Sequence, residues 1–184
     1  MKAFGVPAVF LDRDGVMVRE IDHPRGVEDL RILPGVGLAI ARINQKKYRV
    51  VVVSNQAGVA KGFTTEEKVI EMNEVMAERI YKKGGIIDAL YYCPHHIEGT
   101  VVRYAVRCRC RKPGIGMITK AVRDLNIDIK KSFLVGDKTS DILAGKRAGL
   151  RTVLIKSGYA GKDNLYRITP DFIINRLSDL IPLL

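Results

Sequence analysis

The sequence predicts an α/β protein whose core is a doubly wound, Rossmann-like parallel sheet. Six short apolar runs rich in β-branched residues recur along the 184 residues, and stretches with helical periodicity separate them. This alternation is typical of a parallel sheet with helices on both faces, and continuous apolar runs fit strands buried on both sides. Such sheets bind ligands at the carboxyl ends of their strands, so the polar residues after each run are the candidate site.

The expected elements alternate along most of the chain. The runs expected to form strands are residues 8–11, 50–53, 89–92, 133–135, 152–155 and 172–174. The stretches expected to form helices are residues 36–47, 65–83, 116–125, 140–148 and 177–184. Thr64 and Glu67 have capping-box spacing, which predicts Thr64 as the N-cap of the second helix.

The length and composition fit one globular domain over residues 1–184, because 47% of the residues are hydrophobic and no linker-like tract interrupts them. No apolar run approaches the roughly 20 residues that cross a bilayer. Pro7 interrupts the first apolar stretch, and Asp12 and Arg13 follow before a signal-type cleavage region can form. We therefore expect a cytoplasmic protein without a membrane segment.

The net charge of +11, from 31 Lys and Arg against 20 Asp and Glu, predicts a field that attracts anions. Nucleic acids and phosphorylated metabolites fit this charge equally well, and part of it serves solubility. The decision between them depends on the residues of the site.

Two acids end the first predicted strand, in the run Leu11-Asp12-Arg13-Asp14-Gly15. A carboxylate suits attack on phosphorus because it is already ionised at neutral pH. Asp14 could then protonate the leaving oxygen and later deprotonate water. The alternative is that both acids simply form a turn. A calcium loop is excluded, because the later ligands of its roughly 12 residues are missing.

Further polar residues follow two other predicted strands. Ser54, Asn55 and Gln56 come after residues 50–53 and offer groups that could hold phosphoryl oxygens. Asp137 comes after residues 133–135 and offers the hard oxygen that Mg²⁺ prefers. Lys112 could neutralise the charge of a transferring phosphoryl group.

The order of these motifs resembles the haloacid dehalogenase superfamily: Asp-x-Asp-Gly, a Ser after the second strand, a Lys, then Gly-Asp-x-x-x-Asp. The resemblance implies that Asp12 is the nucleophile and a Mg²⁺ ligand. Asp14 would be the acid and base and would also bind Mg²⁺ through its carbonyl. Most members are phosphatases, although mutases and dehalogenases share the scaffold, and a short chain without a large cap domain favours hydrolysis.

The same resemblance implies roles for the later motifs. Ser54 and Lys112 would bind the phosphoryl group. Asp137 would ligate Mg²⁺, with Asp141 supporting it.

A long stretch without clear periodicity, residues 93–113, contains two pairs of metal-binding side chains, and these define an expected zinc loop over residues 93–110. Cys93, His95, Cys108 and Cys110 supply the four positions of a closed tetrahedral zinc site, which would pin the loop. His96 competes with His95, but the spacing of His95 from Cys93 matches that of the cysteine pair. The alternative is reduced cysteines with surface histidines.

With this loop the chain is similar to the D-glycero-D-manno-heptose 1,7-bisphosphate 7-phosphatases, through Cys-Pro-His-His-x-Glu-Gly and Cys-x-Cys-Arg-Lys-Pro. The resemblance implies that Asn55, Gln56, Arg111 and Lys138 help to hold a small phosphorylated sugar. The related histidinol-phosphate phosphatases carry a similar zinc loop and supply the second candidate substrate. Residues 16–34, expected to form a flap over the site, differ from the usual family pattern, and Ile115 replaces a usual proline.

Two other functions fit less well. A nucleic-acid 3′-phosphatase would suit the positive charge, but aromatic residues make up only 7% of the chain and Trp is absent, which argues against a stacking surface for single strands. A non-enzymatic zinc-stabilised binding module leaves the Asp, Ser and Lys motifs unexplained.

Overall fold

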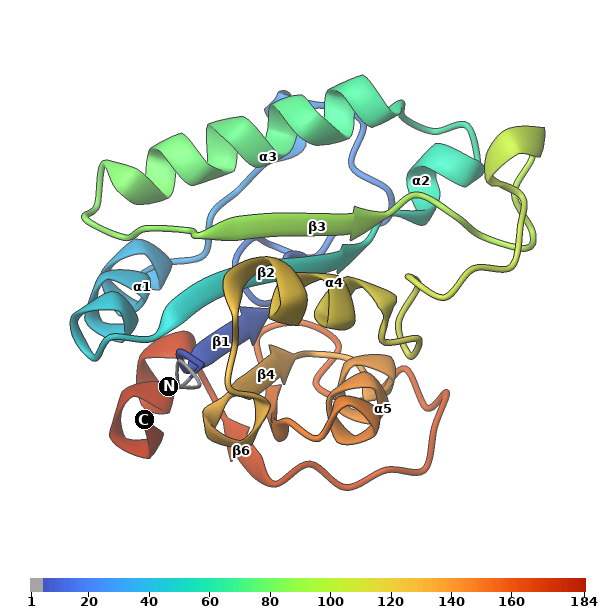
Figure 1. Cartoon of the computed structure of the whole chain (residues 1–184). Coiled ribbons are helices and arrows are strands. Elements are labelled where there is room, and N and C mark those ends of the chain that lie inside the picture. The colour runs from blue at the N-terminus through green and yellow to red at the C-terminus, as the bar shows by residue number, and fades with distance from the viewer. Residues whose placement is uncertain (1–4) are drawn as a thin grey trace.

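The computed structural model describes residues 5–184, and six strands of this part form one parallel sheet in the order β3-β2-β1-β4-β5-β6 (Figure 1). The strands are β1 (Ala8–Leu11), β2 (Arg49–Asn55), β3 (Ala89–Cys93), β4 (Phe133–Gly136), β5 (Arg151–Ile155) and β6 (Phe172–Ile174). The predicted doubly wound fold is confirmed, because this order is that of a Rossmann-like sheet.

Helices cover both faces of the sheet. On one face lie α1 (Val36–Gln45), α3 (Glu66–Tyr81) and the 3₁₀ helix η4 (Leu177–Leu183), and on the other lie α4 (Gly116–Leu125) and α5 (Thr139–Ala148). The side chains of β1 alternate between them: Val9 and Leu11 join the core under α1, whereas Ala8 and Phe10 join the core under α4. Both sets are fully buried, which explains the unbroken apolar run.

Three expectations about helices need correction. The N-cap of α3 is Thr65, whose hydroxyl accepts a hydrogen bond from the Lys68 N–H at 3.3 Å, while the Thr64 hydroxyl donates to the Arg25 carbonyl. The last helix is 3₁₀ rather than α-helical and contains Pro182, which lacks the N–H that an α-helix needs. A short helix α2 (Ala57–Ala60), which is absent from the expected helices, directly follows Gln56.

Two connections at the carboxyl edge of the sheet shape the site. The flap after β1 is closed on itself by an antiparallel bridge between Val18 and Ile32 and contains the short 3₁₀ helix η1 (Val27–Asp29). The loop after β3 contains η2 (Val102–Tyr104), and η3 (Ile129–Lys131) precedes β4. No large cap domain occurs in residues 5–184, and none of their helices is long and apolar enough to cross a membrane.

β1 lies in the middle of the sheet, with β2 and β3 on one side of it and β4, β5 and β6 on the other. The strand order therefore reverses direction between β1 and β4. This topological switch point opens a crevice at the carboxyl ends of the strands. In Figure 1 the arrows of β1, β2 and β3 point toward the side where α2 and the loop after β3 lie.

Candidate active site

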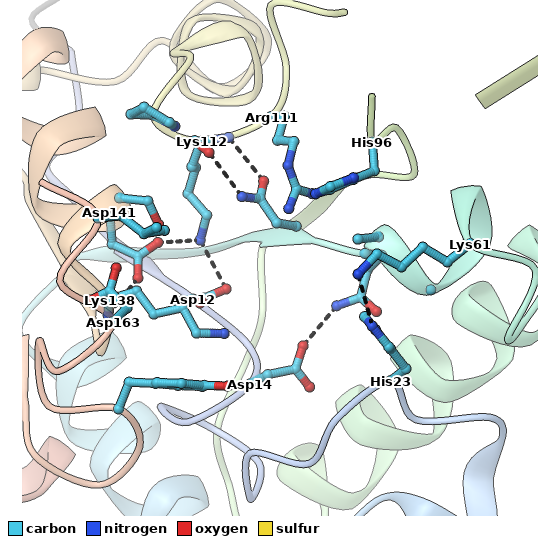
Figure 2. A pocket seen from close by; sticks show the side chains of 18 of the residues that line it. Asp12, Asp14, His23, Lys61, His96, Arg111, Lys112, Lys138, Asp141 and Asp163 are labelled. Atoms are coloured by element: carbon cyan, nitrogen blue, oxygen red, sulfur yellow. Dashed lines mark hydrogen bonds and ion pairs between the residues drawn. The ribbon is translucent and has the colours of Figure 1, made fainter. Parts of the chain in front are cut away.

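Asp12 lies at the first residue after β1, on the floor of a cleft of about 1000 Å³ (Figure 2). Its backbone N–H donates to the Val135 carbonyl at 3.0 Å, which fixes it against β4. Its carboxylate is almost fully buried and lies 2.9 Å from the Lys112 ammonium. The strand end therefore presents a carboxylate whose charge is already paired.

Lys112 is held by three oxygens. Its Nζ donates to the Val53 carbonyl at 2.7 Å and lies 2.7 Å from Asp141 Oδ1, besides its contact with Asp12. Burial alone would lower the pKa of Lys112, but the charges of Asp12 and Asp141 outweigh it and raise this pKa. The ammonium is therefore a fixed positive charge beside the Asp12 carboxylate.

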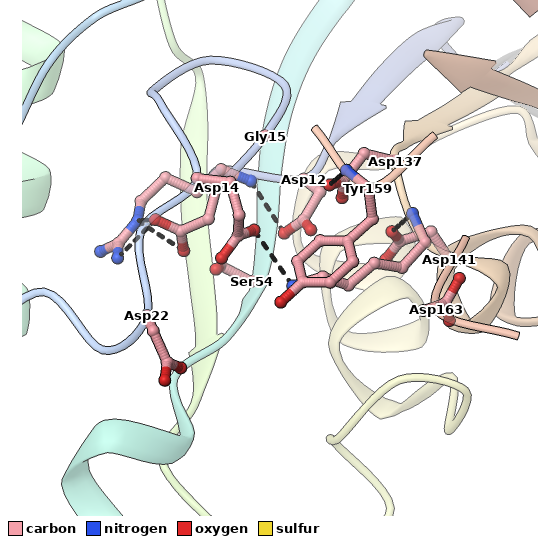
Figure 3. Close-up of polar contacts among 12 residues, drawn as sticks. Asp12, Asp14, Gly15, Asp22, Ser54, Asp137, Asp141, Tyr159 and Asp163 are labelled. Carbon is pink, nitrogen blue, oxygen red and sulfur yellow. Dashed lines mark hydrogen bonds and ion pairs between the residues drawn. The ribbon is translucent and has the colours of Figure 1, made fainter. Parts of the chain in front are cut away.

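Asp12, Asp137 and Asp141 bring carboxylate oxygens within 4.8 Å of one another (Figure 3). Burial raises the pKa of Asp12 to about 6 despite the opposing charge of Lys112. Burial, followed by the charges of Asp12 and Asp141, raises the pKa of Asp137 to about 8. Three crowded, buried acids call for a further positive charge.

The surroundings of Asp137 fit a hard divalent cation such as Mg²⁺. Its Oδ2 accepts a hydrogen bond from the Tyr159 N–H at 2.7 Å, whereas its Oδ1 is buried and has no hydrogen-bond partner among the described residues. A Cβ at Gly15 or Gly158 would lie 2.3 or 2.1 Å from Asp137 Oδ2, so only glycine permits this close packing. The unpartnered oxygen fits a metal ligand.

The Asp14 carboxylate lies apart from these three acids. It accepts hydrogen bonds from Gln56 Nε2 at 2.7 Å and from the guanidinium of Arg13. Gln56 also donates to the Ser54 hydroxyl at 2.8 Å. Figure 3 shows Asp14 and Ser54 on one side of Asp12, with Asp137 and Asp141 on the other.

Asn55 holds the backbone of Lys112. Its side-chain oxygen accepts from the Lys112 N–H at 2.9 Å, and its side-chain NH₂ donates to the Lys112 carbonyl at 3.0 Å. This pair of bonds ties the end of β2 to the segment that carries the lysine. Asn55 therefore places Lys112, in addition to lining the cleft.

The outer wall of the cleft is cationic (Figure 2). Lys61 Nζ lies 3.4 Å from His23 Nε2, and His96 and Arg111 line the same wall. Burial, together with the nearby charges of Lys61 and Arg111, lowers the pKa of both histidines. Neither His23 nor Lys61 was expected from the sequence, because they meet across 38 positions of the chain.

Lys138 stands on the other side of the cleft. Its ammonium lies 3.1 Å from Glu20 of the flap and 4.4 Å from the centre of the Tyr159 ring. Opposed by burial but favoured by the charge of Glu20, its pKa is raised, so the side chain stays charged. This ion pair joins the flap to the start of α5.

Cys93, His95, Cys108 and Cys110 form a separate cluster behind the cleft. The contacts between their ligand atoms run from 3.0 Å for Cys93 Sγ to Cys110 Sγ up to 3.6 Å for Cys93 Sγ to His95 Nδ1. A tetrahedron with zinc–sulfur distances of about 2.3 Å has edges of about 3.8 Å, so the four groups fit one zinc ion. His96 lies outside the cluster, on the wall of the cleft.

Comparisons with known proteins agree with this geometry. A family model described as HAD-hydrolase-like matches residues 109–180. The chain is 39% identical over 180 residues to a D-glycero-beta-D-manno-heptose-1,7-bisphosphate 7-phosphatase of Haemophilus ducreyi, covering 97% of this chain and 98% of that protein. It is 37% identical over 155 residues to the alpha counterpart of Photorhabdus laumondii, covering 84% and 85%.

A solved structure has a similar fold. The D,D-heptose 1,7-bisphosphate phosphatase of B. bronchiseptica, complexed with magnesium and phosphate, superposes with a TM-score of 0.84 at 28% identity, covering 96% of this chain and 97% of that one.

Proposed function

The chain belongs to the heptose bisphosphate 7-phosphatases of the haloacid dehalogenase-like hydrolases, and on that premise we propose that it removes the 7-phosphate of D-glycero-D-manno-heptose 1,7-bisphosphate through a phosphorylated Asp12. The observation that carries the proposal is the arrangement of positive charge in the cleft. Lys112 lies beside the nucleophile, Asp12, and the cationic outer wall, with Lys61 and Arg111, lines the same cleft. A substrate with two phosphates fits both places.

In the first step, an oxygen of the Asp12 carboxylate forms a bond to phosphorus. The bond from phosphorus to the ester oxygen breaks, and its electron pair stays on that oxygen, which takes a proton from Asp14 and leaves as the sugar alcohol. Lys112 and the Ser54 hydroxyl hold the phosphoryl oxygens during transfer, and the Lys112 charge opposes the repulsion between carboxylate and phosphate.

In the second step, water attacks the phosphorus of the aspartyl phosphate. Asp14, now ionised, takes a proton from that water, and the bond between phosphorus and Asp12 breaks. Inorganic phosphate leaves, and Asp12 returns to its carboxylate form. One side chain thus serves as acid and then as base.

Two metal ions fit the proposal. Asp12, Asp137 and the Asp14 carbonyl would hold Mg²⁺, which supplies positive charge against the phosphoryl oxygens when bound. Asp141 holds Lys112 and supports this set. Cys93, His95, Cys108 and Cys110 would hold a structural Zn²⁺. These thiolate ligands fit a reducing compartment, so cytoplasm is the proposed location.

The outer wall favours the bisphosphate over histidinol phosphate. Histidinol phosphate carries an ammonium group and an imidazole but no second phosphate. Lys61 and Arg111 would repel an ammonium and attract a phosphate. The cationic wall thus favours binding of the bisphosphate, which has a second negative group, over histidinol phosphate, which has a positive one.

The test is phosphate release from both anomers of the heptose bisphosphate, from heptose 7-phosphate and from histidinol phosphate, with Mg²⁺ and then with a chelator. We expect kcat/KM for a bisphosphate to exceed that for heptose 7-phosphate by at least about tenfold, given a second charge-assisted contact of about 1.5–3 kcal/mol. Phosphorus NMR should find the 1-phosphate retained. Preference for histidinol phosphate would contradict the substrate assignment.

A further inference from the structure

Arg13 is the largest of the fully buried side chains, and the mechanism above gives it no part. A charged guanidinium is costly to bury unless other groups compensate for its charge and use its donors. Arg13 meets this condition with three side chains from separate segments: Asp14 after β1, Gln56 after β2 and Asn73 on α3. The buried guanidinium therefore links these three segments through hydrogen bonds.

The contacts converge on the carboxylate of Asp14. Arg13 Nη2 lies 3.1 Å from Asp14 Oδ1, and Nε lies 3.2 Å from Oδ2, so the guanidinium spans both oxygens. Gln56 donates to the same Oδ2 at 2.7 Å. The carboxylate is thus held from two sides, in a position beside the Ser54 hydroxyl that Gln56 also contacts.

The guanidinium is itself held from behind. Its Nη1 donates to Asn73 Oδ1 at 3.2 Å, and its Nη2 donates to Gln56 Oε1 at 2.9 Å. Asn73 is buried in α3, a helix of 16 residues that packs against the flap and the sheet face under α1. A regular helix and a strand end therefore fix the direction of the Arg13 side chain.

We propose that Arg13 is a positioning residue that, supported by Asn73 and Gln56, aims the Asp14 carboxylate at the leaving oxygen. The proposal rests on the proposed function. Asp14 lines the cleft, and among the described residues the hydrogen-bond partners of its carboxylate are Arg13 and Gln56, so these two side chains set its direction. Small errors in the direction of a catalytic group cost large factors in rate.

The nucleophile does not depend on this side chain. Asp12 receives a hydrogen bond from the backbone N–H of Arg13 at 2.8 Å, which any substitution except proline keeps, and its charge partner is Lys112. Loss of the guanidinium should therefore impair proton transfer by Asp14 and spare attack by Asp12. A residue that only stabilised the fold would impair both.

Substrates with different leaving groups distinguish a loss of proton transfer from a general loss of stability. A sugar alkoxide needs a proton as it leaves, whereas p-nitrophenolate is stable enough to leave without one. For Arg13→Lys we expect kcat/KM, which reports on the first step and not on the hydrolysis that both substrates share, to fall by about 10²–10³ for the heptose bisphosphate, within the range of about 10²–10⁴ for general acid catalysis. For p-nitrophenyl phosphate we expect kcat/KM to fall by less than about tenfold. A series of substituted phenyl phosphates should show a steeper dependence on the leaving group than wild type.

A double-mutant cycle shows whether Arg13 acts through Asp14. In an Asp14→Asn background, Arg13→Lys should change kcat/KM for the heptose bisphosphate by less than about threefold, because residues that act as a unit are not additive. Asn73→Leu, which removes the outer support without touching the cleft, should give the same selective loss at about three- to tenfold. This second variant answers the question if Arg13→Lys does not fold.

Asn44→Leu is the matched control. Asn44 makes two hydrogen bonds to the backbone of Ile86, away from the cleft, so its loss costs stability but should leave the ratio of the two substrates unchanged. Equal losses on both substrates in folded Arg13 and Asn73 variants, or additive losses in the cycle, would overturn the inference alone. A wild-type enzyme inactive on both anomers of the heptose bisphosphate would instead overturn the proposed function.

Discussion

The ammonium of Lys112 lies 2.9 Å from Asp12 Oδ1 and 2.7 Å from Asp141 Oδ1, so one buried cation compensates for two buried carboxylates. Asn55 fixes the backbone of this lysine from the end of β2. The positive charge is therefore in place before a substrate arrives, which is the condition for electrostatic stabilisation of a transition state.

Replacing Lys112 should remove that charge and leave two uncompensated acids in the path of a phosphate. We expect Lys112→Ala to lower kcat by at least about 10², comparable to the loss of one preorganised donor. Steady-state kinetics with a phosphate-release assay measures it. Lys120→Ala, on the exposed side of α4, is the matched control and should keep its rate. A near-normal rate for Lys112→Ala would remove this residue from the site.

Asp12→Asn should abolish turnover, because an amide is a far weaker nucleophile than a carboxylate. The fold should survive, since the backbone N–H that anchors Asp12 to Val135 is unchanged. Acid quenching of wild type during turnover should trap up to about one phosphate per chain, in a form that hydroxylamine releases. Appreciable activity in Asp12→Asn, or no trapped phosphate, would contradict the covalent mechanism.

Asp137 should make the metal-free protein less stable as the pH rises. Its pKa is raised from 3.8 to about 8, first by burial, so between these values the folded state holds a proton that the unfolded chain has released. Raising the pH across this window therefore favours unfolding. Asp137→Asn removes the effect and should raise the Tm of metal-free protein at pH 8 by at least about 3 °C, from about 2–4 °C per kcal/mol.

The comparison at pH 4 and with Mg²⁺ completes this test. The difference in Tm between Asp137→Asn and wild type should shrink toward pH 4, which lies near the pKa of 3.8 in the unfolded state, because the two states of the wild-type carboxyl then differ by only roughly half a proton. Added Mg²⁺ should stabilise wild type and not the variant, because a ligand stabilises the state that binds it. Parallel curves of Tm against pH for the two proteins would show that Asp137 does not destabilise the metal-free protein as the pH rises.

The strands were predictable because each contains a continuous apolar run, and those of β1, β2 and β4 are buried on both faces. The polar residues at the ends of these three strands do converge on one cleft. The N-cap of α3 could not be predicted, because Thr64 and Thr65 are adjacent residues of the same type. Only the hydrogen bond from the Lys68 N–H to Thr65 distinguishes them. Local periodicity also continued through Pro182, where the backbone lacks a donor.

Contacts between distant residues account for what the sequence analysis missed at the site. Arg13 stands between two acids, and a charged residue is expected to be exposed unless its partner is known. Asn73 lies 60 positions away, so no local pattern reveals it. An arginine flanked by two acids at the end of a buried strand was the one available signal.

Zinc content should follow the four residues of the cluster rather than the histidine pair. Wild type should hold about one zinc per chain, and Cys110→Ser should lose it, because a structural site needs all four ligands. His96→Asn is the matched control, since His96 neighbours His95 but lies outside the cluster. Elemental analysis after dialysis measures the content. Loss of zinc from His96→Asn with retention in His95→Asn would reverse the assignment.

Glu66 should anchor the zinc loop through Tyr92 and Tyr104. Its carboxylate accepts hydrogen bonds from the Tyr92 hydroxyl at 3.0 Å and from the Tyr104 hydroxyl at 2.5 Å, which joins α3 to β3 and to η2. Tyr104 in turn accepts, through its carbonyl, a hydrogen bond from the His96 N–H at 3.1 Å. The anchor thus leads to a residue of the cationic wall.

Glu66→Gln keeps the size of the side chain and weakens both charge-assisted bonds, so we expect a loss of about 1–3 kcal/mol in the free energy of unfolding. Zinc content should not change. KM for the heptose bisphosphate should rise about three- to tenfold with kcat nearly constant, because the wall moves and Asp12 does not. Glu67→Gln, one position along the same helix, is the control. Equal KM values in the two variants would show that the anchor stabilises the loop without placing the wall.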